Sequence, residues 1–150
     1  MKKTYILIIL ISSIFAISCT NQNTQEEVKT PEKLGNADAK IQVIYFHSTN
    51  RCATCNAVES NAKKLLNENF KTQIENGNIN FSSLNIDEEK NKTITEKYLI
   101  STSTLLIINN NTKEEIVVDF TTDAFKYART EPIKYTELLK EEINKQLEIN

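Results

Sequence analysis

The residues of this chain best suited to chemistry are two cysteines three positions apart, Cys52 and Cys55, in the segment RCATCN. They follow an apolar run at 41–47 and a polar bridge at 48–51, and they precede apolar residues at helical spacing. This order predicts that the pair lies on the first turn of a helix. There, unpaired backbone N–H groups and the positive end of the helix dipole favour a thiolate over a thiol. On one turn the two sulfurs can also close into a disulfide with little backbone movement, so the pair can pass two electrons and recover.

Composition narrows the range of partners. The chain has 150 residues and a formal net charge of −2, and its basic residues are scattered, which argues against nucleic acid as a partner. Its two glycines, Gly35 and Gly77, do not form a phosphate-binding loop, and we expect no cofactor. The supply of Ile, Leu and Val is sufficient for the core of one small domain.

The N-terminal segment is typical of an export signal. Residues 1–18 begin with lysines, continue as an apolar run and end in small residues before Cys19. This pattern resembles the bacterial lipoprotein signal, in which the cysteine is lipid-modified and becomes the first residue of the mature chain. A plain cleaved signal and an uncleaved anchor are the alternatives, and all three export the domain. We therefore expect a protein anchored by lipid to the periplasmic or extracytoplasmic face of the cell envelope, with residues 19–39 as the lipidated cysteine and a flexible tether.

From residue 40 to 150 the sequence predicts one α/β domain. Strands are expected at 41–47, 79–86, 104–108 and 115–120, and helices at about 53–70, 88–98 and 132–147. The run Asn109-Asn110-Asn111 is expected to form the hairpin turn between the last two strands, because Asn tolerates left-handed backbone angles. The segment 121–130 is expected to be a short helical insert, either a cap on the sheet edge or an element that contacts substrate.

Together, the motif and the order of elements resemble the thioredoxin-like family of thiol–disulfide oxidoreductases. The resemblance covers about residues 40–149 and rests on VIYFHSTNRCATC, LNIDEEKNKTITEKYLI and STSTLLIINN. It implies a thioredoxin-like fold, with a four-stranded mixed central sheet and flanking helices, in which 41–47 and 104–108 are the central strands. These two runs are among the most continuously apolar of the chain after residue 18, as strands buried on two faces should be, whereas polar residues interrupt the run at 79–86.

Two features common in that family are missing here. A cis-proline usually precedes the third strand and faces the cysteines, but this chain has Ser103 at the matching position. Without proline a cis bond costs roughly 3 kcal/mol, so we expect a trans bond and a reshaped groove. Thr102 and Ser103 either offer hydroxyls to a thiolate or simply begin a strand. The buried acid that serves some thioredoxins as a proton acceptor is also absent, since 41–47 contains no Asp or Glu.

Three charged or titratable side chains flank the motif. Arg51 either lowers the pKa of the Cys52 thiol electrostatically or is an exposed loop charge. His47, the one histidine, either relays protons and senses pH near the site or is structural. Glu59, one turn beyond Cys55, is a weaker candidate whose alternative is a solvated helix face.

Three functions fit these residues, and the position at a helix start favours the first. As a thiol–disulfide oxidoreductase, Cys52 would attack a disulfide of an envelope protein and Cys55 would resolve the mixed disulfide, with a membrane-bound donor supplying electrons for a reductive role. Ala53 and Thr54 match neither the Gly-Pro of strongly reducing members nor the Pro-His of strongly oxidising ones, so the direction of electron transfer stays open.

Alternatively, the dithiol holds copper, zinc or an iron–sulfur cluster with His47 as a third ligand, although a closed zinc site needs four ligands. In the last reading the pair is an inert structural disulfide.

Overall fold

The computed structural model describes residues 33–34 and 38–149, so the predicted signal, Cys19 and most of the predicted tether lie outside the described residues. Four strands form a mixed sheet in the order β3-β2-β4-β5. They are β2 (Ile41–His47), β3 (Ile79–Asn85), β4 (Thr104–Asn109) and β5 (Ile116–Asp119). β2 is parallel to β3 and antiparallel to β4, and β4 is antiparallel to β5. The predicted α/β fold with a four-stranded mixed sheet is confirmed, and it is consistent with a thioredoxin-like fold.

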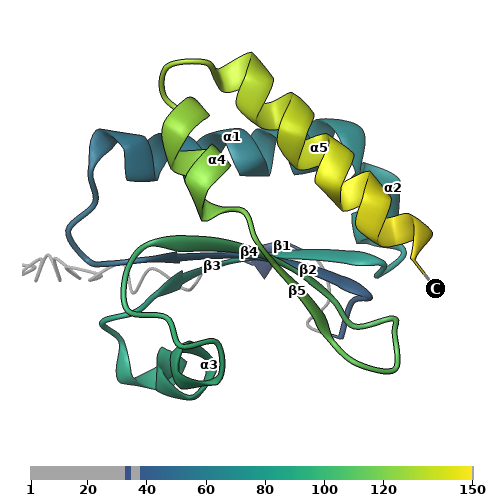
Figure 1. Ribbon diagram of the computed structural model, residues 1–150, viewed down its shortest axis with the longest axis horizontal. Helices are drawn as coiled ribbons and strands as arrows, with labels where there is room; N and C mark the ends of the chain where they lie inside the picture. The colour runs from purple at the N-terminus through teal and green to yellow at the C-terminus, as the bar shows by residue number, and fades with distance from the viewer. Residues whose placement is uncertain (1–32, 35–37, 150) are drawn as a thin grey trace, which may run out of the picture.

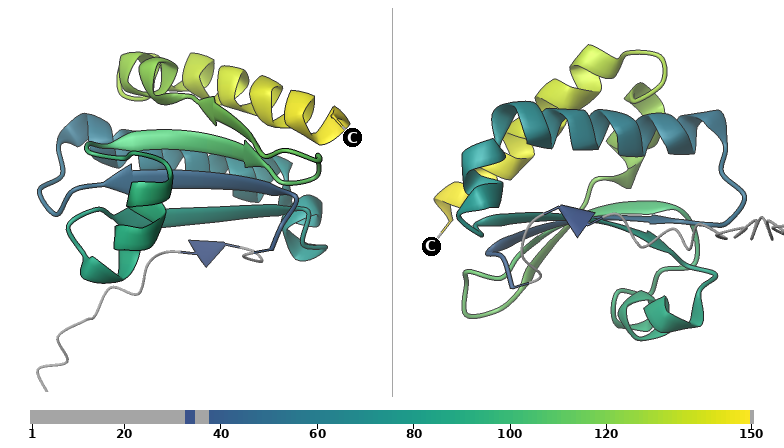
Figure 2. Two further views of the ribbon diagram at one scale, coloured as in Figure 1. Left: turned by 60° about the horizontal axis from the view of Figure 1, so that its bottom comes forward. Right: turned by 180° about the vertical axis from the view of Figure 1, so that it is seen from behind.

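Helices cover both faces of the sheet (Figure 1). One face carries α1 (Ala53–Asn69), α2 (Lys71–Glu75), α4 (Thr121–Tyr127) and α5 (Pro132–Glu148). The 3-10 turn η1 (Glu89–Asn91) and α3 (Lys92–Lys97) lie on the other face, as the rear view in Figure 2 also shows. α4 is the predicted helical insert, whereas α2 was not predicted. Among the described residues, no helix has the length and apolar character needed to cross a membrane.

The central strands separate the core into two clusters. Val43 and Tyr45 of β2 belong to the larger cluster, which α1, α4 and α5 cover. Ile44 and Phe46 of the same strand belong to the smaller cluster, which the α3 side covers. All of β4 is buried as well. The prediction that these two strands are apolar on both faces is therefore confirmed.

Two segments differ from the sequence expectations. β1 (Lys33–Leu34), within the predicted tether, pairs antiparallel with β3 and adds a short fifth strand at the sheet edge. The expectation that the three asparagines form the hairpin turn is wrong for Asn109, which is the last residue of β4 and is fully buried. Its amide donates to the backbone carbonyl of Gln146 in α5 at 2.9 Å. None of the three asparagines has a positive φ, so a buried hydrogen bond and not a left-handed backbone explains Asn109.

Candidate functional site at the start of α1

The loop between β2 and α1 is fastened to the end of β3. The Thr49 backbone N–H donates to the Asp87 carboxylate at 2.7 Å, and the Asn85 amide donates to the Thr49 hydroxyl at 3.0 Å. The Ile86 N–H donates to the His47 carbonyl at 2.8 Å. The backbone hydrogen bond from Thr49 also holds the pKa of Asp87 below its ordinary value. These contacts fix where the chain enters α1.

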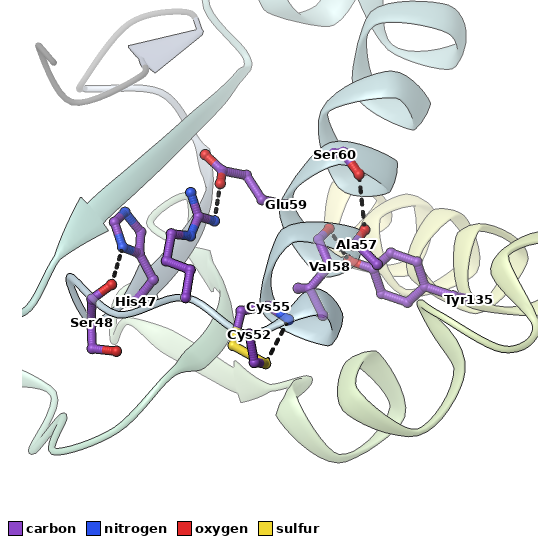
Figure 3. Close-up of polar contacts among 10 residues, drawn as sticks. His47, Ser48, Cys52, Cys55, Ala57, Val58, Glu59, Ser60 and Tyr135 are labelled. Atoms are coloured by element: carbon purple, nitrogen blue, oxygen red, sulfur yellow. Dashed lines mark hydrogen bonds and ion pairs between the residues drawn. A yellow bond between two sulfur atoms is a disulfide. The ribbon is translucent and has the colours of Figure 1, made fainter. Parts of the chain in front are cut away.

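Cys52 caps α1 through its own sulfur (Figure 3). Its backbone is extended, with φ −81° and ψ 165°, and its Sγ accepts the Cys55 backbone N–H at 3.1 Å. A Ser or Asp oxygen usually fills this capping position. Cys52 is exposed, whereas Cys55 is 7% exposed. One sulfur-bearing side chain therefore faces solvent and the other faces the interior.

The two cysteines are joined by a disulfide, with their Cα atoms 5.0 Å apart. The predicted placement of the pair at a helix start after the first central strand is confirmed. No acidic residue lies in the first turn of α1, so no local carboxylate opposes the positive end of the helix dipole. In the reduced state, a thiolate at Cys52 would accept a charge-assisted hydrogen bond from the same backbone N–H. This arrangement suggests redox activity.

Arg51 and Glu59 form an ion pair beside the disulfide, and Figure 3 shows the Glu59 carboxylate engaged in it. Their side chains are only 25% and 13% exposed. The Arg51 guanidinium carbon also lies 5.8 Å from the centre of the Tyr45 ring. Arg51 is therefore not a free loop charge, and Glu59 is not on a solvated helix face. Because the carboxylate compensates the guanidinium, the attraction between Arg51 and a Cys52 thiolate is weaker than for an unpaired arginine.

Tyr45 lies beneath this ion pair on β2. Its side chain is fully buried, and its hydroxyl makes no hydrogen bond within residues 38–149. Burial raises the pKa of Tyr45, although the neighbouring Arg51 guanidinium and Ser103 hydroxyl act in the opposite direction. Polar groups from β2, from the motif loop and from the residue before β4 thus meet at one buried point. The sequence offered no sign of this cluster, since each member lies in a different segment.

The segment before β4 lies at the same end of the sheet as the cysteine loop, because Thr104 pairs with Phe46 of β2. Thr102 is exposed and Ser103 is half-buried. The expected trans bond at Ser103 is confirmed, since the described residues contain no cis peptide bond. In residues 101–104 the one side-chain hydrogen bond runs from the Thr104 hydroxyl to the Thr102 carbonyl, at 3.0 Å. In this disulfide form the hydroxyls of Thr102 and Ser103 are not bonded to sulfur.

The other predicted neighbours have simpler surroundings. His47 Nδ1 lies 2.9 Å from the Ser48 carbonyl oxygen, a local contact that fits a structural role. Ala53 is exposed and Thr54 is half-buried in the first turn of α1. Across the part of the chain that the structure describes, no three His, Cys, Asp or Glu side chains gather where a metal ion could bind. In this disulfide form His47 does not lie in a group with the two cysteines.

Comparisons with known proteins give no functional name. No known protein family matches the chain, and no curated protein is significantly similar to it. Among solved structures, one described as "Structure of a malarial protein" is 19% identical over 66% of this chain and 96% of that chain, with a TM-score of 0.41. A likeness at that level carries no argument about function.

Proposed function

We propose that this protein is a thioredoxin-like thiol–disulfide oxidoreductase of the cell envelope, which exchanges electrons with partner proteins through Cys52 and Cys55. The observation that carries the proposal is the sulfur of the exposed Cys52, which caps α1 and accepts the Cys55 N–H at 3.1 Å. At this position the backbone donor and the helix dipole stabilise a thiolate, and exposure lets a protein substrate reach it. The buried Cys55 suits the second, resolving step.

The reaction is a pair of thiol–disulfide exchanges. As a reductant, the Cys52 thiolate attacks one sulfur of the partner's disulfide, and the partner's other sulfur leaves as a thiolate that takes up a proton. The Cys55 thiol then loses its proton and attacks the Cys52 sulfur of the mixed disulfide. This forms the Cys52–Cys55 disulfide. The partner has been reduced by two electrons and carries two thiols in place of its disulfide. As an oxidant, the protein runs the same steps in reverse.

The proposal includes a place in the cell. A lipid on Cys19 and the segment between Cys19 and β1 would hold the domain at the membrane, within reach of envelope disulfides and of a membrane-bound electron donor. Growth with labelled fatty acid tests this part. We expect label on the wild-type protein and none on Cys19→Ser. Label on both proteins or on neither would contradict a lipid at Cys19.

Equilibration in glutathione buffers tests the chemistry, with the whole chain carrying Cys19→Ser and kept in detergent. We expect a reversible two-electron couple in mass spectra. Cys52→Ser should abolish exchange with a model disulfide, whereas Cys55→Ser should accumulate the mixed disulfide. A matched control places a cysteine at the exposed Ser60 of α1 in a chain without the motif cysteines, and it should react more slowly near neutral pH.

Three results would contradict the proposal. A pair that resists mild reductants would indicate an inert structural disulfide. Stoichiometric metal in the protein as isolated would indicate a metal-binding or metal-delivery module. Capture of the model substrate by Cys52→Ser but not by Cys55→Ser would reverse the roles of the two cysteines.

A further inference from the structure

We infer that Glu59 is a positioning residue that holds the charge of Arg51 away from the Cys52 sulfur, and so keeps the cysteine pair toward the reducing end of its range. The inference rests on the proposed function and concerns the direction of electron transfer, which Ala53 and Thr54 leave open.

The ion pair brackets the cysteine motif. Arg51 directly precedes Cys52, and Glu59 lies one turn after Cys55, so positions 55 and 59 fall on the same side of α1. The two charged groups contact each other. The Glu59 end of the contact and the disulfide are both visible in Figure 3. Arg51, the charged residue next to Cys52 in the sequence, is therefore paired with the carboxylate of Glu59.

This ion pair differs from the other ion pairs on the same side of the fold. Its side chains are 25% and 13% exposed, whereas those of Lys64 and Glu68, also on α1, are 69% and 60% exposed. A half-buried ion has lost part of its hydration, so Arg51 and Glu59 each depend on the other. The Tyr45 ring beneath the guanidinium restrains it further. Arg51 is thus less free to turn toward another anion than a surface arginine would be.

The redox consequence follows from the charge that reduction creates. Reduction breaks the S–S bond with two electrons, leaves a thiolate on Cys52 and adds one proton to Cys55. An unpaired arginine next to that thiolate would stabilise the reduced form and make the pair more oxidising. With Glu59 compensating Arg51, the stabilisation of the thiolate comes mainly from the start of α1. The reduced form is accordingly a better electron donor.

Other titratable groups face this region and need to be controlled. They are Tyr45 and His47 from β2, Asp87 after β3 and Tyr135 from α5. Burial raises the pKa of both tyrosines, so they stay neutral near pH 7. The hydrogen bond from Thr49 lowers the pKa of Asp87, so its carboxylate stays ionised there. His47 also lies on this side of β2, and each measurement is repeated with His47→Gln as a control.

The test is the pH dependence of Cys52 alkylation in the reduced whole chain carrying Cys19→Ser. Glu59→Gln should lower the pH midpoint by about one unit, because it removes a negative charge and leaves Arg51 without its partner. At a pH above both midpoints, the glutathione equilibrium should shift roughly tenfold toward the reduced form. The double variant Arg51→Gln and Glu59→Gln should return the midpoint close to the wild-type value. Glu68→Gln, an exposed site on the same helix, should leave it unchanged.

A second variant guards against a folding defect. Glu59→Asp keeps the negative charge but shortens its reach, so the midpoint should fall by less than in Glu59→Gln. A midpoint that stays constant or rises in Glu59→Gln, in a protein that still exchanges disulfides, would overturn this inference and leave the proposed function standing. A Cys52 midpoint equal to that of the cysteine control at position 60, with no exchange, would instead refute the proposed function.

Discussion

The two long helices of this domain have equal lengths but begin differently. α1 and α5 each span 17 residues and bury their apolar sides in the same core cluster. The cysteine sulfur at position 52 caps α1, whereas Glu131 gives α5 no side-chain cap and Pro132 begins that helix. Tertiary packing therefore holds a helix of this length without a cap. It follows that the residue before α1 can be a reactive cysteine without loss of the helix.

The largest expected effect concerns the core cluster in which both long helices bury their apolar sides. Leu66 of α1 and Leu139 of α5 are both fully buried. Replacing either by alanine should lower the free energy of unfolding by about 3 kcal/mol, through lost burial and a residual cavity. Urea unfolding followed by circular dichroism measures the loss, with the 74% exposed Ile133→Ala as a control that should change stability by less than about 0.5 kcal/mol. If only one of the two alanine variants is destabilised, then the two helices are not held by the same core packing.

The next effect concerns the side-chain cap, which α1 has and α5 lacks. Cys52→Ser and Cys52→Ala both lack the disulfide, so the difference between them reports the cap alone. The serine variant should be more stable by about 1 kcal/mol, because its oxygen can accept the same N–H. The matched variants Glu131→Ser and Glu131→Ala should differ by less, because the backbone at Glu131, with φ −135° and ψ 62°, lacks the extended geometry from which a capping side chain reaches the first turn. Equal differences at both helix starts in urea unfolding would show that the sulfur of Cys52 is not acting as a cap.

A smaller effect is expected where the two helices are joined. The buried Tyr135 hydroxyl of α5 donates to the Val58 carbonyl of α1 at 3.1 Å. Tyr135→Phe should lower the free energy of unfolding by about 1 kcal/mol, because one buried hydrogen bond is lost while the ring stays packed. Tyr98→Phe removes a hydroxyl whose bonds lie at the surface and should cost less than Tyr135→Phe. If the two variants lose the same free energy of unfolding, the buried hydrogen bond between the helices stabilises the fold no more than one at the surface.

The smallest effect is a pH dependence at the loop before α1. That loop is held by the Asp87 carboxylate, whereas the turn before α5 is closed by a backbone bond from the Glu131 N–H to the Tyr127 carbonyl. The hydrogen bond from the Thr49 N–H lowers the pKa of Asp87 below its ordinary value in the folded state, so the contribution of Asp87 to stability is present above the unfolded pKa and is lost as the pH falls through the folded pKa. The Thr49 amide resonance should therefore shift with a midpoint below the ordinary pKa of an aspartate, and it should stay constant in Asp87→Asn. A midpoint at or above that ordinary pKa would contradict the bond.

Much of this fold could be predicted because its main elements carry long apolar patterns. The strand at 41–47 agrees with β2 at both ends, and the helix at 132–147 differs from α5 by one residue. α2 was missed because none of its residues is buried, so it leaves no periodic signal. β1 was missed because two residues paired through their backbone leave no side-chain pattern either. The backbone of Leu99 was also unforeseen, since this residue follows the C-cap of α3 with φ 54°, where Gly or Asn is usual.

The site could be predicted only where it is local in sequence. The order of strand, loop and helix was enough to place Cys52 and Cys55, because the positions of both depend on that order. The contact between Arg51 and Glu59 depends instead on how the loop turns into α1, which no sequence period encodes. The available signal was weak: opposite charges on the two sides of the motif, the acid on the same side of the helix as Cys55.

The hydrogen bond from Asn109 to Gln146 has a mechanical consequence. Asn109 is the final residue of a central strand, and Gln146 lies in the last turn of α5, with both side chains almost completely buried. A force applied at the C-terminus would reach this bond before any pairing within the sheet. In an optical-trap experiment the last helix should therefore peel away as a separate early event, with the sheet and its cysteine loop still intact.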